Sequence, residues 1–213
     1  DMLRATLEWR DREGVQCALS QWDKEPHEAL DNYWKPIGIM GVDRDGDPVI
    51  WDRIGQGHVP SLLRLGERWP VKHEIFVQEC FMASLERSRQ QHPQGGGGYQ
   101  FTVIIDLDGL NASHADRHGL AMYKVLTRIG ADHYPEIVKR IIVVRAPWIF
   151  PLIWRIVQTF MDKGTVEKVK IVGDKDAYRA VSQCVSEEQI PKALGGRKVL
   201  DGDDWCGSVV PAA

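Results

Sequence analysis

The chain has 213 residues, of which 43% are hydrophobic and 27% are charged. These are the proportions of an ordinary globular protein, and they exclude a mainly disordered chain. The length suits one large domain or two small ones. The formal net charge of −3 provides no general basic surface, so we expect no nucleic-acid partner.

Neither a membrane span nor a disulfide framework is predicted. The longest uncharged stretch in the C-terminal half, residues 146–154, ends at Arg155, well short of the roughly 20 apolar residues that a spanning helix needs. The four cysteines are far apart and form no Cys-x-x-Cys pair, which favours free thiols in a cytoplasmic protein and argues against zinc. They are Cys17, Cys80, Cys184 and Cys206.

The first part of the chain predicts two helices and a β-hairpin. Residues 2–13 and 25–34 are the helix candidates, and the β-rich runs 37–42 and 48–54 flank an Asp-Gly turn, which is typical of a hairpin. The turn contains Asp43, Asp45 and Asp47, spaced like the start of a calcium loop. Because strands flank it and no Glu stands at the twelfth position, we interpret it as a turn.

The rest of the chain alternates between helices and apolar strands. Helices are predicted over residues 71–91, 113–130, 147–161 and 175–185, and strands over residues 101–107, 140–145 and 168–172. The strands are apolar without polar alternation, which indicates a parallel sheet buried by helices on both faces. The predicted fold class is therefore α/β, with the hairpin joined to a mostly parallel sheet.

One predicted helix does not fit an ordinary sheet-covering role. Between residues 148 and 161 only Arg155, Gln158 and Thr159 are polar, whereas a covering helix normally has one apolar stripe and one wet face. Such a helix is either buried on all sides, or it lines an apolar ligand cavity with one face and meets a membrane surface with the other. Composition alone leaves both interpretations open.

Two of the predicted strands end in aspartates, and this pattern suggests a phosphatase. Asp106 and Asp108 follow one apolar strand and Asp174 follows another, as in Mg²⁺-dependent phosphatases of the haloacid-dehalogenase type. There Asp106 would attack phosphorus, Asp108 would be the general acid/base and Asp174 would help to hold Mg²⁺. Against this, about 100 residues precede a motif that normally opens its domain, and such carboxylates are also common as caps.

A second possible site is the pair His114 and His118, which are four residues apart on a predicted helix. This spacing could place two metal ligands on one helix face. Because no third ligand is in view, we interpret the pair as part of a solvated helix start and predict no metal site.

Several segments, in order along the chain, resemble the CRAL-TRIO lipid-binding family. They are Leu7-Glu8-Trp9-Arg10, the residues 43–49, Ile105-Asp106-Leu107-Asp108-Gly109, Tyr134-Pro135-Glu136 with the strand after it, Thr165-Val166-Glu167-Lys168 and Ile190-Pro191-Lys192-Ala193-Leu194. The resemblance covers about 190 residues and also explains the Asp motifs as family structure. It divides the chain into the end of an N-terminal helical segment (residues 1–30), the lipid-binding domain (31–200) and a tail (201–213), with further domains expected in the full-length protein.

The resemblance implies a curved, largely parallel sheet that forms the floor of an apolar pocket. A mobile helix, residues 150–162, would close this pocket as a gate. The expected pocket and gate residues are Trp148, Phe150, Ile153, Trp154, Val157, Phe160, Phe101 and Val103. Phe101 and Val103 stand where choline-lipid-binding members carry hydroxyl residues, which argues against phosphatidylcholine as a second ligand.

The resemblance also implies a headgroup site. In phosphoinositide-binding members, the residues at Glu136, Lys168 and the neighbouring Thr165 contact the inositol phosphate. A lysine suits a phosphodiester, a threonine can donate a hydroxyl, and a glutamate accepts from inositol hydroxyls. Without the resemblance, Glu136 and Lys168 would be interpreted as ordinary surface charges.

The expected protein is a carrier, not an enzyme. It would bind one lipid, most plausibly phosphatidylinositol, and transfer or present it between membranes, as a cytoplasmic protein that docks transiently on membrane surfaces. No cofactor besides the bound lipid is expected. Tocopherol, retinal and squalene are also carried by relatives, and a module that has lost its ligand is the remaining alternative.

Overall fold

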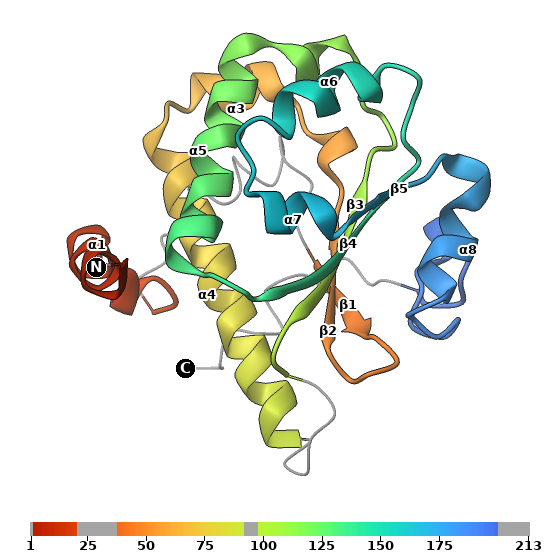
Figure 1. Ribbon diagram of the computed structural model, residues 1–213, viewed down its shortest axis with the longest axis horizontal. Coiled ribbons are helices and arrows are strands. Elements are labelled where there is room, and N and C mark those ends of the chain that lie inside the picture. The colour runs from red at the N-terminus through yellow and green to blue at the C-terminus, as the bar shows by residue number, and fades with distance from the viewer. Residues whose placement is uncertain (1, 21–37, 92–97, 200–213) are drawn as a thin grey trace.

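The computed structural model describes residues 2–20, 38–91 and 98–199. Within them, a five-stranded sheet covered by helices confirms the predicted α/β class (Figure 1). The strands lie side by side in chain order: β1 (Gly38–Val42), β2 (Pro48–Asp52), β3 (Phe101–Asp106), β4 (Val138–Val144) and β5 (Val169–Ile171). β1 and β2 form the predicted antiparallel hairpin, and the other pairings are parallel. The predicted helix 25–34 lies outside the described residues.

Helices lie on both faces of this sheet (Figure 1). α3 (Val59–Arg64), α4 (Arg68–Gln91), α5 (Arg117–His133) and α6 (Phe150–Val157) are on one side, and α8 (Ala177–Ser182) is on the other. α1 (Met2–Glu13) lies outside α4 and α5, and α7 (Lys163–Glu167) connects α6 to β5. The described residues also contain short 3-10 turns: η1 (Val15–Cys17), η2 (Ile54–Gln56), η3 (Ala112–Ala115), η4 (Asp174–Asp176) and η5 (Lys192–Leu194).

Side chains of β3 alternate between two cores, as the pleat of a strand requires. Ile104 belongs to the core under α8, whereas Phe101 belongs to the core under α4. Further along the same face, Ile105 packs against the apolar cluster built around α6. Both faces of the strand are thus apolar, which is why its sequence showed no polar alternation.

The acidic hairpin turn is held by the ammonium group of Lys139. The buried Asp43 carboxylate accepts hydrogen bonds from the backbone of Asp47 at 3.0 Å and from the hydroxyl of Thr102 at 2.8 Å. Lys139 donates to Asp45 and Asp47, both at 2.7 Å. These bonds tie the turn to β3 and β4, in agreement with its interpretation as a turn.

The apolar helix is shorter than predicted. A helix was expected over residues 147–161, but α6 begins at Phe150 and ends at Val157, after which the chain turns into α7, capped by Asp162. Pro151 in the first turn favours a helix start there. Among the described helices, none combines the length and apolar character needed to cross a bilayer.

Candidate functional site: an apolar cavity under helix α6

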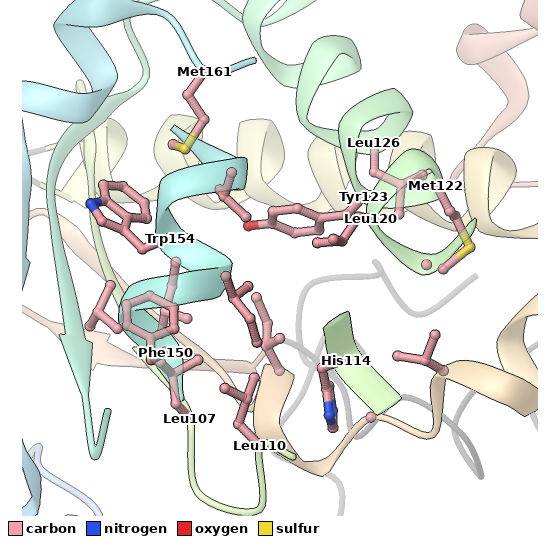
Figure 2. Close-up of a pocket in the computed structure, with 18 of the residues that line it drawn as sticks. Leu107, Leu110, His114, Leu120, Met122, Tyr123, Leu126, Phe150, Trp154 and Met161 are labelled. Atoms are coloured by element: carbon pink, nitrogen blue, oxygen red, sulfur yellow. The ribbon is translucent and has the colours of Figure 1, made fainter. Parts of the chain in front are cut away.

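A cavity of about 120 Å³ lies between the sheet, α3, α5 and α6 (Figure 2). Ile105, Ile141 and Val143 project into it from β3 and β4. These three residues lie on the sheet face opposite α8, so the alternation of the strands positions the cavity floor. Among residues 2–20, 38–91 and 98–199, no Asp, Glu, Lys or Arg lines the cavity.

Helix α6 closes one side of the cavity. Its lining residues are Phe150, Ile153, Trp154 and Val157, which repeat at the three- and four-residue spacing of one helix face. The rings of Phe150 and Trp154 stack at a centroid distance of 6.1 Å. Just beyond the helix, Phe160 packs edge-on against Tyr123 of the cavity wall, with centroids 6.3 Å apart.

The remaining members of the predicted pocket set lie elsewhere. Trp148 precedes α6 and is 92% exposed, so it is a surface residue. Phe101 is on the same sheet face as the cavity, but at the start of β3, where α4 covers the sheet and Phe81 packs against it at 5.2 Å. Val103 lies between these two regions, touching both clusters without lining the cavity.

Sequence reasoning missed the wall that α5 provides. Leu120, Tyr123 and Leu126 line the cavity from this helix, and they follow the spacing of one helix face. That spacing was visible in the sequence, but every helix that covers a sheet has apolar residues at this spacing. The spacing therefore could not indicate that a cavity, and not a filled core, lies between α5 and the sheet.

The two charged headgroup candidates lie side by side at the surface. Lys168 Nζ lies 3.5 Å from Glu136 Oε2, and it donates a 2.8 Å hydrogen bond to the carbonyl of Val138. Glu136 is in the left-handed region, with φ of 61°, and its side chain is 86% exposed. Lys168 directly precedes Val169, which lines the cavity, so the pair stands next to the cavity wall.

The third headgroup candidate already has a partner. The Thr165 hydroxyl donates to the Asp162 carboxylate, which also accepts from the backbone of Thr165 at 2.7 Å. The side-chain hydrogen bond from Thr165 lowers the pKa of Asp162. In this arrangement the hydroxyl of Thr165 can accept a hydrogen bond from a ligand, but its own hydrogen is in use.

The phosphatase alternative fails on the geometry of Asp106. This residue is 1% exposed, and its carboxylate accepts from Trp51 Nε1 at 3.1 Å and from Arg145 Nε at 2.8 Å. A nucleophile must present a free oxygen to phosphorus, and here both oxygens are engaged. Asp106 instead fixes Arg145, a residue with φ of 56° at the junction between β4 and the segment that leads to α6.

The histidine pair is also separated by the structure. His114 is buried on η3, where its Nδ1 accepts a 3.2 Å hydrogen bond from the backbone of Asn111. His118 is on α5, with its ring nitrogen 3.5 Å from the exposed Asp116. The two rings therefore serve different local contacts.

Acidic groups lie behind the cavity wall on the side of Tyr123. Burial raises the pKa of Glu74 on α4 to about 7, although Gln78 donates a 2.7 Å hydrogen bond to it. Burial also raises the pKa of Tyr123, and the carboxylates of Asp52 and Glu74 add to this effect. The side of the cavity at Tyr123 thus disfavours additional negative charge.

The fold and the site together define an α/β domain with an apolar cavity that is covered on one side by one short helix. The chain belongs to the CRAL/TRIO domain family, whose model matches residues 33–196. The match confirms the family that the sequence motifs suggest. Its members are lipid-binding and lipid-transfer domains.

Two kinds of relatives are similar to the chain. It is 30% identical over 200 residues to "Protein real-time" of Anopheles gambiae and 29% identical over 198 residues to "Protein real-time" of Drosophila melanogaster. Each alignment covers 92% of this chain but only 28% and 29% of those proteins. The crystal structure of Sfh5 has the same fold, with a TM-score of 0.65 at 20% identity, over 81% of this chain and 59% of that one.

Removal of the Asp106 carboxylate is expected to destabilise the fold. Asp106→Ala leaves Arg145 and Trp51 without their buried acceptor, so the free energy of unfolding should fall by about 3 kcal/mol. Asp108→Ala is the matched control, because its carboxylate is 56% exposed and contacts the same arginine at 3.4 Å; its loss should cost less than about 1 kcal/mol. Urea unfolding measures both, and equal stability of the two variants would contradict the structural role of Asp106.

Glu74 should make stability depend on pH. Its folded-state pKa of about 7 lies above the ordinary value of 4.5, so the folded state is favoured by protonation and stability is lost as the pH rises from 4.5 through 7. Burial lowers the pKa of His73 to about 4, which acts in the opposite direction, with stability lost as the pH falls from 6.5 through 4. Comparison of Glu74→Gln with the wild type removes the His73 contribution.

Glu74→Gln should match the wild type near pH 4.5 and exceed its stability at pH 8 by on the order of 2 to 3 kcal/mol. The measurement is urea unfolding across this pH range, with the exposed Glu67→Gln as the control. A constant difference between Glu74→Gln and the wild type at all pH values would contradict the buried, protonated state of Glu74.

Proposed function

We propose that this domain binds a single lipid, phosphatidylinositol, with its acyl part in the cavity and its headgroup at Lys168 and Glu136, and transfers or presents it between membranes. The observation that carries the proposal is an apolar cavity whose lining residue Val169 directly follows Lys168. Lys168 is half-buried and pairs with the exposed Glu136. A phosphoinositide has the matching division between an apolar body and a charged, hydroxyl-rich head.

The chemistry of the pair suits this headgroup. Lys168 supplies a positive charge for the phosphodiester, and Glu136 accepts hydrogen bonds from inositol hydroxyls. Thr165 contributes its hydroxyl oxygen as a further acceptor, since its hydrogen is donated to Asp162. When the ligand binds, the weak contact of 3.5 Å between Lys168 and Glu136 would be replaced by stronger contacts to the ligand.

The size of the cavity requires α6 to move. A cavity of about 150 Å³ holds one benzene molecule, so the 120 Å³ seen here has no room for an acyl chain. Enlargement must come from the lining elements, and α6 is a short helix joined to its neighbours by turns. We therefore take the structure to represent the closed state of the proposed carrier.

The outer face of α6 suits a membrane surface. Leu152 and Ile156 are 59% and 42% exposed, and Trp148 just before the helix is 92% exposed. Tryptophan and aliphatic side chains on one helix face favour the interfacial region of a bilayer. Because Ile153 and Val157 of the same helix line the cavity, insertion of the outer face would couple membrane docking to opening.

Coupling between membrane docking and opening of the cavity would lower the free-energy cost of moving a lipid between membranes. Exposing one buried CH₂ group to water costs about 0.8 kcal/mol, so an acyl chain of ordinary length costs on the order of 10 kcal/mol. A pocket that opens only at the bilayer avoids most of this cost. Closure in water then keeps the lipid covered during transfer.

Lys168→Ala should weaken phosphatidylinositol binding by about tenfold or more, because it removes a charge-assisted hydrogen bond. The domain is incubated with mixed liposomes, and bound lipid is identified by native mass spectrometry. Lys170→Ala is the matched control: Lys170 is two residues further along the chain, on β5, and contacts Gln183 at 2.9 Å, away from the proposed headgroup site.

The outcomes separate the parts of this proposal. A phosphatidylinositol adduct lost in Lys168→Ala and kept in Lys170→Ala supports both the lipid and its headgroup site. An adduct of a neutral isoprenoid or sterol would discard the headgroup assignment, and the absence of any lipid adduct would contradict the proposed function.

The pair Leu152→Asp and Ile156→Asp should reduce lipid transfer between vesicles at least tenfold, because charges on this face oppose insertion into the bilayer. Both positions are exposed, so thermal stability should remain within a few degrees of the wild type. Val125→Asp, at an exposed position of α5, is the control. Unchanged transfer by the double variant would show that this face of α6 does not dock.

A further inference from the structure

The loop between α5 and β4 determines where both charges of the proposed headgroup site lie. Glu136 belongs to this loop, and Lys168 Nζ donates a 2.8 Å hydrogen bond to the carbonyl of Val138, the first residue of β4. The same ammonium group lies 3.5 Å from the carboxylate of Glu136. A change in the conformation of residues 134–138 would therefore move the two charges relative to each other.

The backbone of Glu136 is held in an unfavourable conformation. Its φ of 61° lies in the left-handed region, which residues other than glycine adopt only at a cost in free energy. Such a conformation persists where the surrounding structure fixes the chain. The contacts on either side of Glu136 must therefore hold the loop.

Contacts with the sheet fix the loop on the side of β4. The amide of Phe101 donates a 2.7 Å hydrogen bond to the carbonyl of Ile137. The side chain of Gln100 donates to the carbonyl of Glu136 itself at 3.0 Å. The side chain of Ile137 packs against the apolar cluster under α4 and against the cluster around Trp9. This end of the loop is thus attached to the sheet and its covering helix.

Tyr134 fixes the other side of the loop, and it connects the loop to α1. Its hydroxyl donates a 2.7 Å hydrogen bond to Glu79 on α4. Burial and this hydrogen bond raise the pKa of Tyr134, so the hydroxyl remains a donor. The same carboxylate of Glu79 accepts hydrogen bonds from Arg10 of α1 at 2.9 and 3.1 Å. One carboxylate therefore joins α1 and α4 to the start of the loop that carries Glu136.

Ring contacts strengthen the attachment of α1. The indole of Trp9 stacks on the ring of His133 at a centroid distance of 3.8 Å, and it meets the ring of Tyr134 edge-on at 6.2 Å. Trp9 and Tyr134 are both buried, and the guanidinium of Arg10 lies 6.0 Å from the centroid of the Tyr134 ring. Two successive residues of α1 thus hold the end of α5 and the first residue of the loop.

We propose that α1 is a positioning element of the headgroup site, and that Arg10 and Tyr134 are positioning residues that act through Glu136. The docked α1 keeps the loop in the conformation that places the carboxylate of Glu136 beside Lys168. Neither α1 nor residues 134–138, all of them described, contribute to the lining of the cavity. Loss of the docking should therefore weaken the binding of phosphatidylinositol and leave the binding of an uncharged lipid unchanged. The inference rests on the headgroup site proposed above.

Arg10→Gln should raise the dissociation constant for phosphatidylinositol about fivefold, because the bonds that attach α1 to Glu79 are lost. The dissociation constant for diacylglycerol with the same acyl chains should not change. Each lipid is titrated in vesicles of dioleoyl phosphatidylcholine, and the bound fraction is measured by native mass spectrometry. Arg4→Gln is the matched control on the same helix, since the exposed Arg4 pairs with Glu8 at 3.1 Å, one turn along α1.

Tyr134→Phe tests the same connection with a smaller change, because it removes one hydroxyl and keeps the ring against Trp9. It should also weaken the binding of phosphatidylinositol and leave that of diacylglycerol unchanged. Tyr178→Phe, on α8 at the opposite face of the sheet, is its control. In a Glu136→Gln background, which itself binds phosphatidylinositol more weakly, Tyr134→Phe should cause no further loss, because the two changes act through one contact.

Amide exchange in the lipid-free domain provides a measurement that does not depend on the ligand. The amide of Phe101, which donates to Ile137 in the loop, should exchange faster in Arg10→Gln and in Tyr134→Phe than in the wild type. The amide of Leu107, which donates to Val144 at the other end of the same two strands, should exchange at the wild-type rate in both variants.

Three results would overturn the inference and leave the carrier function in place. They are an equal loss of affinity for both lipids, a loss that persists in the Glu136→Gln background, and an unchanged exchange rate of the Phe101 amide. Equal binding of phosphatidylinositol by the wild type and by Glu136→Gln would contradict the proposed headgroup site, and the inference would fall with it.

Discussion

Helix α6 has apolar side chains on two faces, and the described part of the chain covers one of them. The inner face, with Ile153 and Val157, completes the wall of the cavity, whereas Leu152 and Ile156 remain exposed. Exposed apolar groups that cluster mark contact surfaces. The helix is thus held in place by the contacts of its inner face. Insertion into a bilayer would bury the apolar side chains of its outer face. Closure of one side of the cavity and the membrane docking proposed above both depend on this one eight-residue segment.

The sheet provides the rigid frame for this segment. Asp106, at the end of β3, binds Arg145 at the end of β4, and so fixes the point from which the chain departs towards α6. The proposed movement of α6 requires a firm attachment at its ends, and a buried charge pair of this kind is costly to break. Asp106, which belongs to the motif that resembles a phosphatase, therefore has a structural role: it fixes Arg145. In contrast, Glu136 is exposed, and the half-buried Lys168 is held by the carbonyl of Val138 at 2.8 Å and by the weaker contact to Glu136 at 3.5 Å.

The order of strands and helices could be predicted from the sequence because each apolar run had the period and length of its element. The two-faced character of α6 was visible for the same reason. Its true bounds were not, since the proline that starts the helix and the turns that end it act through local backbone geometry. Phe101 was placed in the pocket because the resemblance puts ligand-contacting residues of choline-lipid-binding members at this position. The packing of α4 against the start of β3 is a long-range contact without a local signal.

The central claim is that α6 separates from α5 when the domain takes up lipid at a membrane. The distance between spin labels at Arg155→Cys on α6 and Lys124→Cys on α5, both exposed positions, can be measured by electron paramagnetic resonance in a background without other reactive cysteines. The account predicts a single short distance in water and an additional, longer one on phosphatidylinositol-containing vesicles. An identical distance distribution in both conditions, in samples that have demonstrably loaded lipid, would contradict it.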